Sequence, residues 1–251
     1  MRRGRAGRTF SCGSRYIAIK RCNPDILPAA MGTTLYIIRH GQSAENTGEN
    51  LGGDSELTAI GREQAVLTGQ WLRTGTDRRP RPTVVVASPA LRTVETARAI
   101  AEACDVPLLI DPDLCEFGML YEAPGLSGDQ LQSLVPRAEL PEAFPRDRGW
   151  AEHVDGEEKH QLHERVERSI ERYVEGVGWR GHESPSAVAI VSHAHFGGFF
   201  LGRLFRIPID QLSSNRLRLS NCGVSQVTVT HRYRQLEAGN HTAHLDGQDT
   251  R

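Results

Sequence analysis

The chain lacks any long apolar run. None of its segments approaches the roughly 18 apolar residues that a membrane-spanning helix needs, so we expect no membrane partner. Paired cysteines are also lacking, because the five cysteines are odd in number, widely scattered and without a CxxC pair. Such usage favours reduced thiols in a cytoplasmic protein over disulfides in a secreted one.

Sequence signatures of metal and nucleotide sites are lacking as well. The chain has no HExxH, no EF-hand loop and no Walker A glycine loop, so we predict neither a metal nor a cofactor. The spacing of His193 and His195 could hold a metal ion, but the sequence supplies no evident third ligand.

A large charge of one sign is absent from the chain as a whole, but the charge is unevenly distributed. The formal net charge is −1, from 30 basic and 31 acidic residues. Residues 1–30 contain seven Lys or Arg and one acidic residue, which leaves 23 basic and 30 acidic residues, a net charge of −7, in residues 31–251. An acidic body argues against nucleic acid as a partner.

A length of 251 residues favours one large α/β domain. We predict a catalytic domain over residues 31–235 and a polar, frayed tail over residues 236–251. Residues 1–30 are rich in Arg and lack the apolar core of a secretory signal. Because Met31 stands just ahead of the first predicted strand, we expect residues 1–30 to be a disordered basic extension or an over-extension of the reading frame.

Short apolar runs alternate with helical patterns along the body of the chain. This alternation predicts an α/β fold with three α/β/α layers around a mostly parallel central sheet. The predicted strands are residues 35–38, 84–87, 106–110 and 187–191, with late, antiparallel strands at 216–219 and 224–230, and the predicted helices are residues 58–73, 88–103, 129–134, 157–177 and 196–204.

The sequence predicts an N-cap residue for two of these helices. Thr58 can cap the first, whose apolar residues Ile60, Leu67 and Trp71 are expected to form its buried face. Ser88 is expected to be the N-cap of the second helix, with a proline at its first position.

Three predicted strands end at residues that can bind phosphate. Arg39 and His40 follow the first strand, Arg92 follows the second after a short turn, and His193 follows the strand at 187–191. If these strands are parallel neighbours, their carboxyl ends meet at one edge of the sheet, where ligands of α/β proteins bind. Two guanidiniums beside two imidazoles then describe a site for a phosphate dianion with a nucleophile at its centre.

The residue types suit that chemistry. Arginine offers a planar fork that matches two phosphate oxygens. A neutral imidazole can attack phosphorus and form a phosphohistidine that water later cleaves. Nearby arginines disfavour the imidazolium, and the leaving alkoxide needs a proton from a carboxylic acid in the pocket.

Four ordered motifs resemble the histidine phosphatase superfamily, also called phosphoglycerate mutase-like. They are RHGQSAEN at residues 39–46, LTAIGREQA at 57–65, SPALRTVETA at 88–97 and VSH at 191–193. The resemblance extends over roughly residues 33–231 and implies a phosphoglycerate mutase-like fold. It further implies a set of site residues: His40 as the nucleophile, His193 as its catalytic partner, Arg39, Arg92, Asn46 and Ser43 around the phosphate, and Glu116 as the proton donor.

The chain departs from the family pattern at two places. The segment Leu114-Cys115-Glu116-Phe117-Gly118 has a compressed spacing between its acid and its glycine, so Glu122 is the alternative proton donor. Bulky His195 comes two residues after the second histidine, where the family commonly has glycines. We place His195 and Tyr121 at the rim of the substrate pocket.

These observations predict a metal-independent phosphomonoester hydrolase that acts on a small phosphorylated metabolite through a phosphohistidine. A phosphoglycerate mutase would use the same residues, but the mutases of this family carry a longer, basic segment resembling NERHYG around the acid, which this chain lacks. A protein phosphatase and a non-catalytic module that binds phosphorylated ligands are further alternatives. The expected partner is the small phosphomonoester substrate, and a homodimer is an assembly that the sequence allows.

Overall fold

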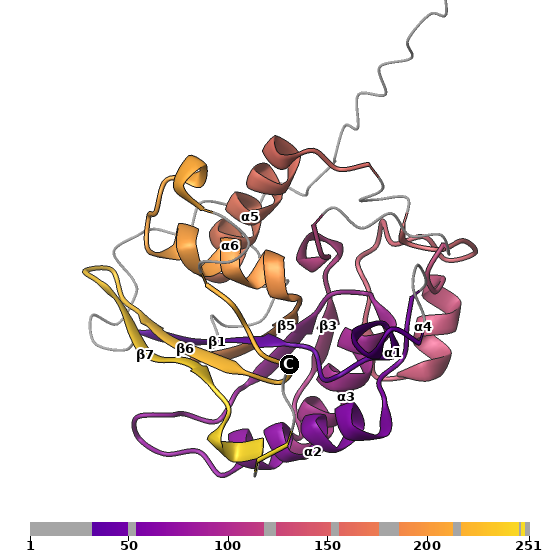
Figure 1. The fold of residues 1–251 in the computed structure, drawn as a ribbon, viewed down its shortest axis with the longest axis horizontal. Helices are drawn as coiled ribbons and strands as arrows, with labels where there is room; N and C mark the ends of the chain where they lie inside the picture. Colours follow the sequence, from indigo (N-terminus) through magenta and orange to yellow (C-terminus); the bar gives the residue numbers. More distant parts are fainter. Residues whose placement is uncertain are drawn as a thin grey trace, which may run out of the picture. The chain divides into compact units, whose positions relative to one another are not determined.

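A mixed sheet lies at the centre of the described part of the chain, with its seven strands in the order β4-β3-β2-β5-β1-β6-β7 (Figure 1). The strands from β4 to β1 run parallel to their neighbours, whereas β6 is antiparallel to both β1 and β7. The strands are β1 (Thr33–Arg39), β2 (Val84–Ala87), β3 (Leu108–Ile110), β4 (Ala138–Glu139), β5 (Ala187–Ser192), β6 (Val224–Val229) and β7 (Arg234–His241). The predicted mostly parallel central sheet is therefore confirmed.

The computed structural model describes seven stretches of the chain. All of them belong to one compact unit, Met31–Arg251. The predicted extension over residues 1–30 lies outside the described residues. The described stretches are residues 32–49, 54–117, 124–151, 156–175, 186–212, 217–245 and 247–248.

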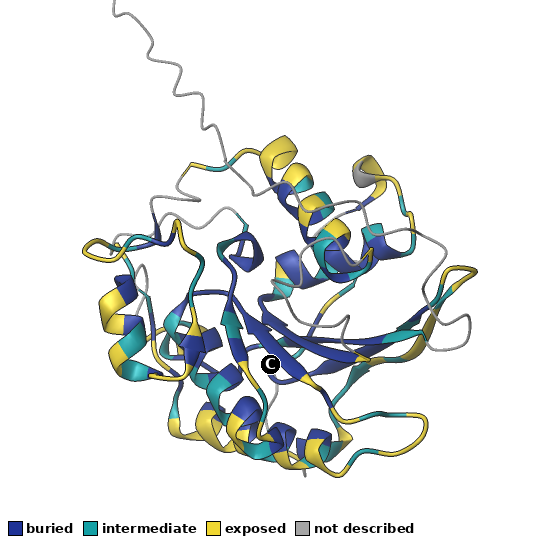
Figure 2. Cartoon of the chain, turned by 180° about the vertical axis from the view of Figure 1, so that it is seen from behind, coloured by how far each residue is buried: buried dark blue, intermediate teal, exposed yellow. Residues whose placement is uncertain are grey.

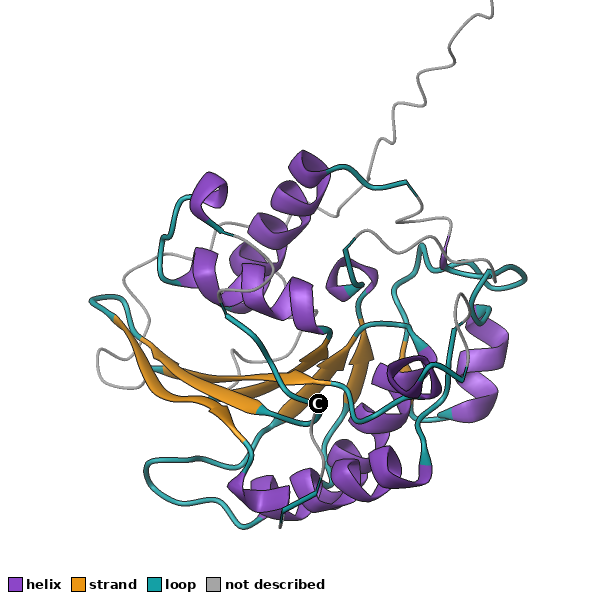
Figure 3. Ribbon diagram, in the orientation of Figure 1, coloured by secondary structure: helices purple, strands orange, loops and turns teal. Residues whose placement is uncertain are grey.

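Helices cover both faces of the sheet, which gives the three layers that the sequence predicts (Figure 3). The pair α2 (Ala59–Arg73) and α3 (Leu91–Cys104) lies on one face, and the pair α5 (Lys159–Tyr173) and α6 (Ala194–Leu204) lies on the other. Shorter helical segments are α1 (Ala44–Thr47), α4 (Gly128–Leu134) and the 3₁₀ turns Pro112–Leu114, Ile209–Gln211 and Ala243–Leu245.

Alternation along the central strands divides the core in two. In β1, Tyr36 and Ile38 pack with the residues of α3, whereas Leu35 and Ile37 pack with those of α5 and α6. Successive side chains of a strand point to opposite faces, so a strand covered on both sides is apolar throughout. Figure 2 shows the central strands buried and the outer surfaces of the helices exposed.

The buried face of α2 differs from the prediction. Ile60 is 43% exposed, whereas Leu67 and Trp71 are partly buried against the core as predicted. The fully buried positions are small and polar residues together with Leu72. A Cβ atom at Gly69 would lie 2.9 Å from the Cβ atom of Ala103 on α3. The small residues face α3 because they let the two helices approach closely, which an apolar stripe of larger residues would prevent.

The start of α3 also differs from the prediction. The helix begins at Leu91 with Ala90 as its N-cap, so Ser88 does not cap it. The backbone N–H of Leu91 instead donates to Oδ1 of Asp54 over 2.7 Å. An acid distant in the sequence thus takes the capping position, and the Ser88 hydroxyl instead contacts Nε2 of His193.

The tail from residue 236 is polar, but it is not frayed over its first residues as predicted, because Arg234–His241 forms β7 and pairs with β6. None of the eight residues of β7 is buried and four are exposed, so its sequence lacks the apolar alternation that would have identified a strand. It is an edge strand whose hydrogen bonds come from the backbone. The strand predicted at 216–219 is not observed in its described residues 217–219, which have no regular structure. The antiparallel strand predicted at 224–230 is confirmed as β6.

Candidate active site

The ends of three neighbouring strands bring the predicted residues together. In the sheet, Arg39 at the end of β1 is paired with Ser192 at the end of β5, and Ala87 at the end of β2 is paired with Val191. His40 and His193 come directly after β1 and β5, and Arg92 is the second residue of α3. The two imidazole rings meet edge to face with their centroids 5.3 Å apart.

His40 is buried and held in one tautomer. Its Nδ1 lies 2.7 Å from the carbonyl oxygen of Gly41. A carbonyl oxygen only accepts, so Nδ1 carries the ring proton and Nε2 carries a lone pair. Nε of Arg92 donates to this Nε2 over 3.3 Å. The nitrogen that can act as a nucleophile therefore faces a guanidinium.

The two arginines differ in how their donors are engaged. Nη1 of Arg39 donates to the carbonyl oxygen of Leu219 over 3.1 Å, and its Nε is buried without a hydrogen-bond partner among the described residues. Arg92 is 2% exposed, and its Nη1 lies 3.4 Å from Oε2 of Glu45. Buried donors in proteins are nearly always paired, so the open donor of Arg39 fits an anionic ligand.

His193 is the N-cap residue of α6 and is almost fully buried. Its Nε2 lies 2.9 Å from Oγ of Ser88, while its Nδ1 has no partner among the described residues. If the Ser88 hydroxyl donates to Nε2, then Nδ1 keeps the proton and can donate to an oxygen of a bound phosphate.

Burial and positive neighbours keep both imidazoles neutral. The pKa of His40 lies well below its usual value because the ring is desolvated and because Arg92 and Arg39 repel a further positive charge. The pKa of His193 is lowered well below its usual value for the same reasons, burial first and then Arg92. A neutral His40 has the free lone pair that nucleophilic attack needs.

Glu116 follows the 3₁₀ turn Pro112–Leu114 and meets the start of α6. Its carboxylate accepts from the backbone N–H groups of His195 (3.1 Å), Phe196 (2.9 Å) and Phe117 (2.9 Å). These bonds hold the Glu116 carboxylate next to His193, although the two residues are far apart in the sequence. His195 lies at the rim, with 46% of its side chain exposed and Nδ1 3.6 Å from Oε2 of Glu116.

The loop after His40 places Asn46 in the pocket but not Ser43. Oδ1 of Asn46 accepts from the backbone N–H of Ser43 (3.1 Å) and from Nδ2 of Asn221 (3.0 Å). Ser43 is fully buried at the N-cap of α1 and does not line the pocket. Its position therefore does not support the predicted contact with phosphate.

These residues enclose a pocket of about 310 Å³. Its lining includes six of the predicted site residues, two of which are the imidazoles themselves, and His195 lies at its edge. Tyr121 and Glu122 lie outside the described residues, so their predicted roles stay predictions. The pocket is lined by Arg39, His40, Glu45, Asn46, Arg92, Glu116, Phe117, His193, Ala194 and His195.

Several supporting residues were not predicted from the sequence. Glu45 pairs with Arg92, Ser88 contacts His193, and Asn221 donates to the carbonyl oxygen of His40 over 3.1 Å as well as to Asn46. Oγ1 of Thr96 accepts from the N–H of Gly41 over 3.1 Å. Glu45 stands inside the first motif and could have been noticed there, but nothing in the sequence near Asn221 points to the site.

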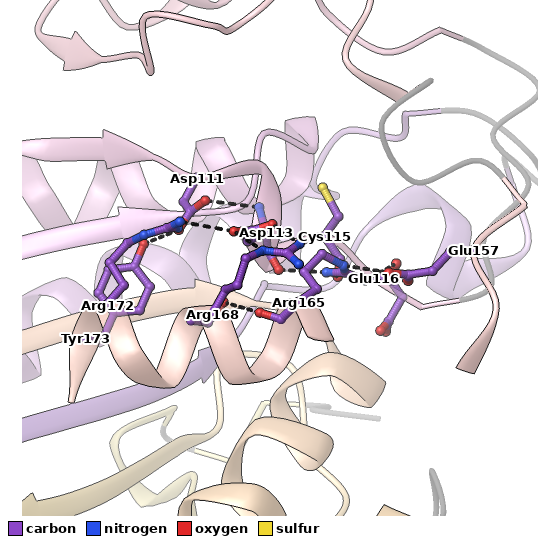
Figure 4. A network of polar contacts seen from close by, with 10 residues as sticks. Asp111, Asp113, Cys115, Glu116, Glu157, Arg165, Arg168, Arg172 and Tyr173 are labelled. Atoms are coloured by element: carbon purple, nitrogen blue, oxygen red, sulfur yellow. Dashed lines mark hydrogen bonds and ion pairs between the residues drawn. The ribbon is translucent and has the colours of Figure 1, made fainter. Parts of the chain in front are cut away.

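A buried guanidinium supports the segment that carries Glu116 (Figure 4). Arg165 of α5 donates to the carbonyl oxygens of Asp113 (2.7 Å), Cys115 (2.6 Å) and Glu116 (3.5 Å) and makes two bonds to the carboxylate of Glu157. It is 1% exposed, and its guanidinium stacks over the ring of Phe196 on α6 at 5.0 Å. Arg165 thus joins the Glu116 segment to α5 and α6.

The described residues contain no group of three or more His, Cys, Asp or Glu side chains arranged to hold a metal ion. None of the helices in the described stretches is long and apolar enough to cross a membrane.

Comparisons with known proteins identify the superfamily that the four sequence motifs resemble. The model of the "Histidine phosphatase superfamily (branch 1)" matches residues 35–242. A Yersinia pestis (strain Pestoides F) protein named "Probable phosphoglycerate mutase GpmB" is 30% identical to this chain over 84% of this chain and 94% of its own length.

Two solved structures have a similar fold. The first is a mycobacterial glucosyl-3-phosphoglycerate phosphatase in complex with VO3, with a TM-score of 0.57 and 21% identity over 84% of this chain and 100% of the other. The second is the alpha-ribazole phosphatase from Shigella flexneri, with a TM-score of 0.57 and 22% identity over 83% of this chain and 96% of the other.

Proposed function

The chain belongs to the histidine phosphatase superfamily, and on that basis we propose that it is a phosphomonoester hydrolase that works without a metal ion. The observation that carries the proposal is the environment of His40. Its proton is held at Nδ1 by the Gly41 carbonyl, and its Nε2 faces Arg92 in a pocket that also contains Arg39, His193 and Glu116.

In the proposed reaction, Arg39, Arg92 and His193 bind the phosphate oxygens. Nε2 of neutral His40 attacks phosphorus, the bond from phosphorus to the ester oxygen breaks, and protonated Glu116 gives its proton to the leaving alkoxide. The Gly41 carbonyl stabilises the positive charge that the ring then carries. Water next attacks the phosphohistidine and loses its proton to Glu116, which releases inorganic phosphate and restores neutral His40.

The size of the pocket supports a small substrate. A volume of about 310 Å³ is at the lower end of the range for small-molecule sites, roughly 300–1,000 Å³. We propose a small phosphorylated metabolite as the substrate rather than a phosphoprotein. This substrate, the homodimer and the cytoplasmic location stay predictions.

The first test is hydrolysis of p-nitrophenyl phosphate in the presence of EDTA. We expect the wild type to be active and His40→Ala to have no measurable activity. A suitable control is His163→Ala, because His163 lies on α5, pairs with Glu167 and does not line the pocket. Rapid quenching of the wild type followed by mass measurement should show one added phosphoryl group. Activity of His40→Ala at the wild-type rate would contradict the mechanism.

Phosphoryl transfer of the mutase type is the second candidate, since the Yersinia relative is named a phosphoglycerate mutase. A mutase returns the phosphoryl group of the phosphohistidine to its product, whereas a phosphatase gives it to water. Incubation with 3-phosphoglycerate and a bisphosphoglycerate separates the two: a mutase forms 2-phosphoglycerate, and a phosphatase only releases phosphate.

A further inference from the structure

Glu45 is a carboxylate in the pocket that the proposed reaction does not use. Its Oε2 lies 3.4 Å from Nη1 of Arg92, and 30% of its side chain is exposed, against 2% for that of Arg92. It lines the pocket together with the two arginines. Its negative charge therefore lies next to the place where Arg92 would hold a phosphate oxygen.

The backbone that carries Glu45 is held in place. The neighbouring Asn46 is hydrogen-bonded to Asn221 and to the N–H of Ser43, and α1 ends at Gly48, which has a φ of 79°. The N–H of Ala44 donates to the carbonyl oxygen of Glu56 over 3.1 Å. These contacts anchor the turn on both sides of Glu45 and hold its backbone next to Arg92.

Among the described residues that line the pocket, no cation remains for a second anionic group of a substrate. Arg39 and Arg92 are the permanent cations among the described lining residues, and Glu45 is the carboxylate that lies there besides the proton donor Glu116. The phosphate dianion takes both guanidiniums. The nearby Arg218 is exposed and interacts with Arg39, but it does not line the pocket.

The remaining ionisable side chains do not change this balance. His40 and His193 are buried and neutral. His195 lies at the rim, with 46% of its side chain exposed and its Nδ1 3.6 Å from Oε2 of the proton donor Glu116. A carboxylate on the alcohol part of a substrate would face the carboxylate of Glu45 in a partly buried site, where repulsion between like charges is screened less than in water.

We propose that Glu45 determines the class of leaving group, an inference that rests on the proposed phosphatase function. The alcohol part of the substrate is uncharged or cationic, and a hydroxyl or ammonium group on it donates to the Glu45 carboxylate. Phosphomonoesters whose alcohol part carries a carboxylate are disfavoured. We therefore expect small polyol and amino-alcohol phosphates to bind more tightly than phosphoglycerates.

The test compares two ligands that differ at one group. Glycerol 3-phosphate has a hydroxymethyl group where 3-phosphoglycerate has a carboxylate. We would measure the competitive inhibition constants of both against p-nitrophenyl phosphate for the wild type, Glu45→Gln and Glu49→Gln. Glu49 is a matched control because it is exposed, lies four residues further on and does not line the pocket.

We expect the wild type to bind glycerol 3-phosphate at least tenfold more tightly than 3-phosphoglycerate. Glu45→Gln should reduce this ratio at least fivefold, chiefly by tighter binding of 3-phosphoglycerate, and Glu49→Gln should leave it unchanged. Equal or tighter binding of 3-phosphoglycerate by the wild type, or an unchanged ratio in Glu45→Gln, would overturn the proposal.

Failure of the proposed phosphatase function can be distinguished from failure of the inference about Glu45. If the wild type does not hydrolyse p-nitrophenyl phosphate, the phosphatase function fails. Calorimetric binding of the same two ligands to the same three proteins would still show whether Glu45 discriminates between them, with the same ratios expected and the same results overturning the proposal.

Discussion

Nε of Arg92 donates to Nε2 of His40 over 3.3 Å, so the guanidinium that we expect to bind phosphate contacts the nitrogen that we expect to attack it. An imidazolium could not accept this bond, since both of its nitrogens are donors. The contact therefore exists only with neutral His40. In this site the binding of phosphate and the protonation state of the nucleophile depend on the same side chain.

Replacement of Arg92 by Gln should change both the rate and its pH dependence. We expect kcat/KM to fall by about 10²-fold or more, as for the loss of one donor to a developing anion. The positive charge of Arg92 lowers the pKa of His40, so its removal raises that pKa. Because only neutral His40 attacks, the pH below which the rate falls should move upward. A pH profile of kcat/KM for p-nitrophenyl phosphate measures both effects, and an unmoved acid limb would contradict the coupling.

Replacement of Glu116 by Gln should affect substrates according to their leaving group. A general acid contributes roughly 10²–10⁴-fold where the leaving oxygen needs a proton. We expect an alkyl phosphate to be slowed in that range and an aryl phosphate to be slowed much less, because an aryl oxide leaves with little help. The measurement is the ratio of kcat for the two substrate types. Equal slowing of both would move the role of acid to Glu122.

The central part of the site could be predicted because each residue stands at a strand end that the sequence marks. His40, His193, Arg39 and Arg92 follow apolar runs, and parallel neighbours must bring their ends to one edge. The partners of these residues could not be predicted in the same way. Asn221 reaches the carbonyl of His40 from a turn 181 residues later, and only the antiparallel pairing of β6 with β1 brings that turn close.

Ser43 matches a motif position and is buried at the N-cap of α1, so its predicted contact with phosphate stays a prediction. The errors in the predicted fold have physical causes of the same kind. The face of α2 was assigned by the size of its apolar residues, whereas helix packing is decided by how closely two backbones can approach. An edge strand such as β7 buries little on either face, so hydrophobic patterning does not reveal it.

Replacement of Gly61 by Ala should disturb the site from outside the pocket. A Cβ atom at Gly61 would lie 1.9 Å from the carbonyl oxygen of Gln42, in the loop that follows His40. Either the loop or the start of α2 must move, so we expect kcat to fall at least tenfold and stability to fall by about 1–3 kcal/mol.

The control for Gly61 is Gly239→Ala, where the nearest atom, Cδ2 of Leu236, would be at an ordinary 3.6 Å. Initial rates with p-nitrophenyl phosphate and urea unfolding of both variants provide the comparison. Equal rates in the two variants would show that the contact between α2 and the loop does not position His40.

Replacement of Arg165 by Met should be strongly destabilising, whereas Arg168→Met on the same helix should not. Loss of Arg165 leaves the carboxylate of Glu157, which is 6% exposed, without its partner, and breaking a buried pair in this way costs about 3–5 kcal/mol. Arg168 is 46% exposed, and its ion pair with Asp113 is worth about 1 kcal/mol or less. The double variant Arg165→Met with Glu157→Gln removes the unpaired charge and should recover part of the lost stability. The free energy of unfolding in urea is measured for the two single variants and the double variant. An equal loss of stability in Arg165→Met and Arg168→Met would mean that the buried pair of Arg165 and Glu157 in Figure 4 does not hold the Glu116 segment.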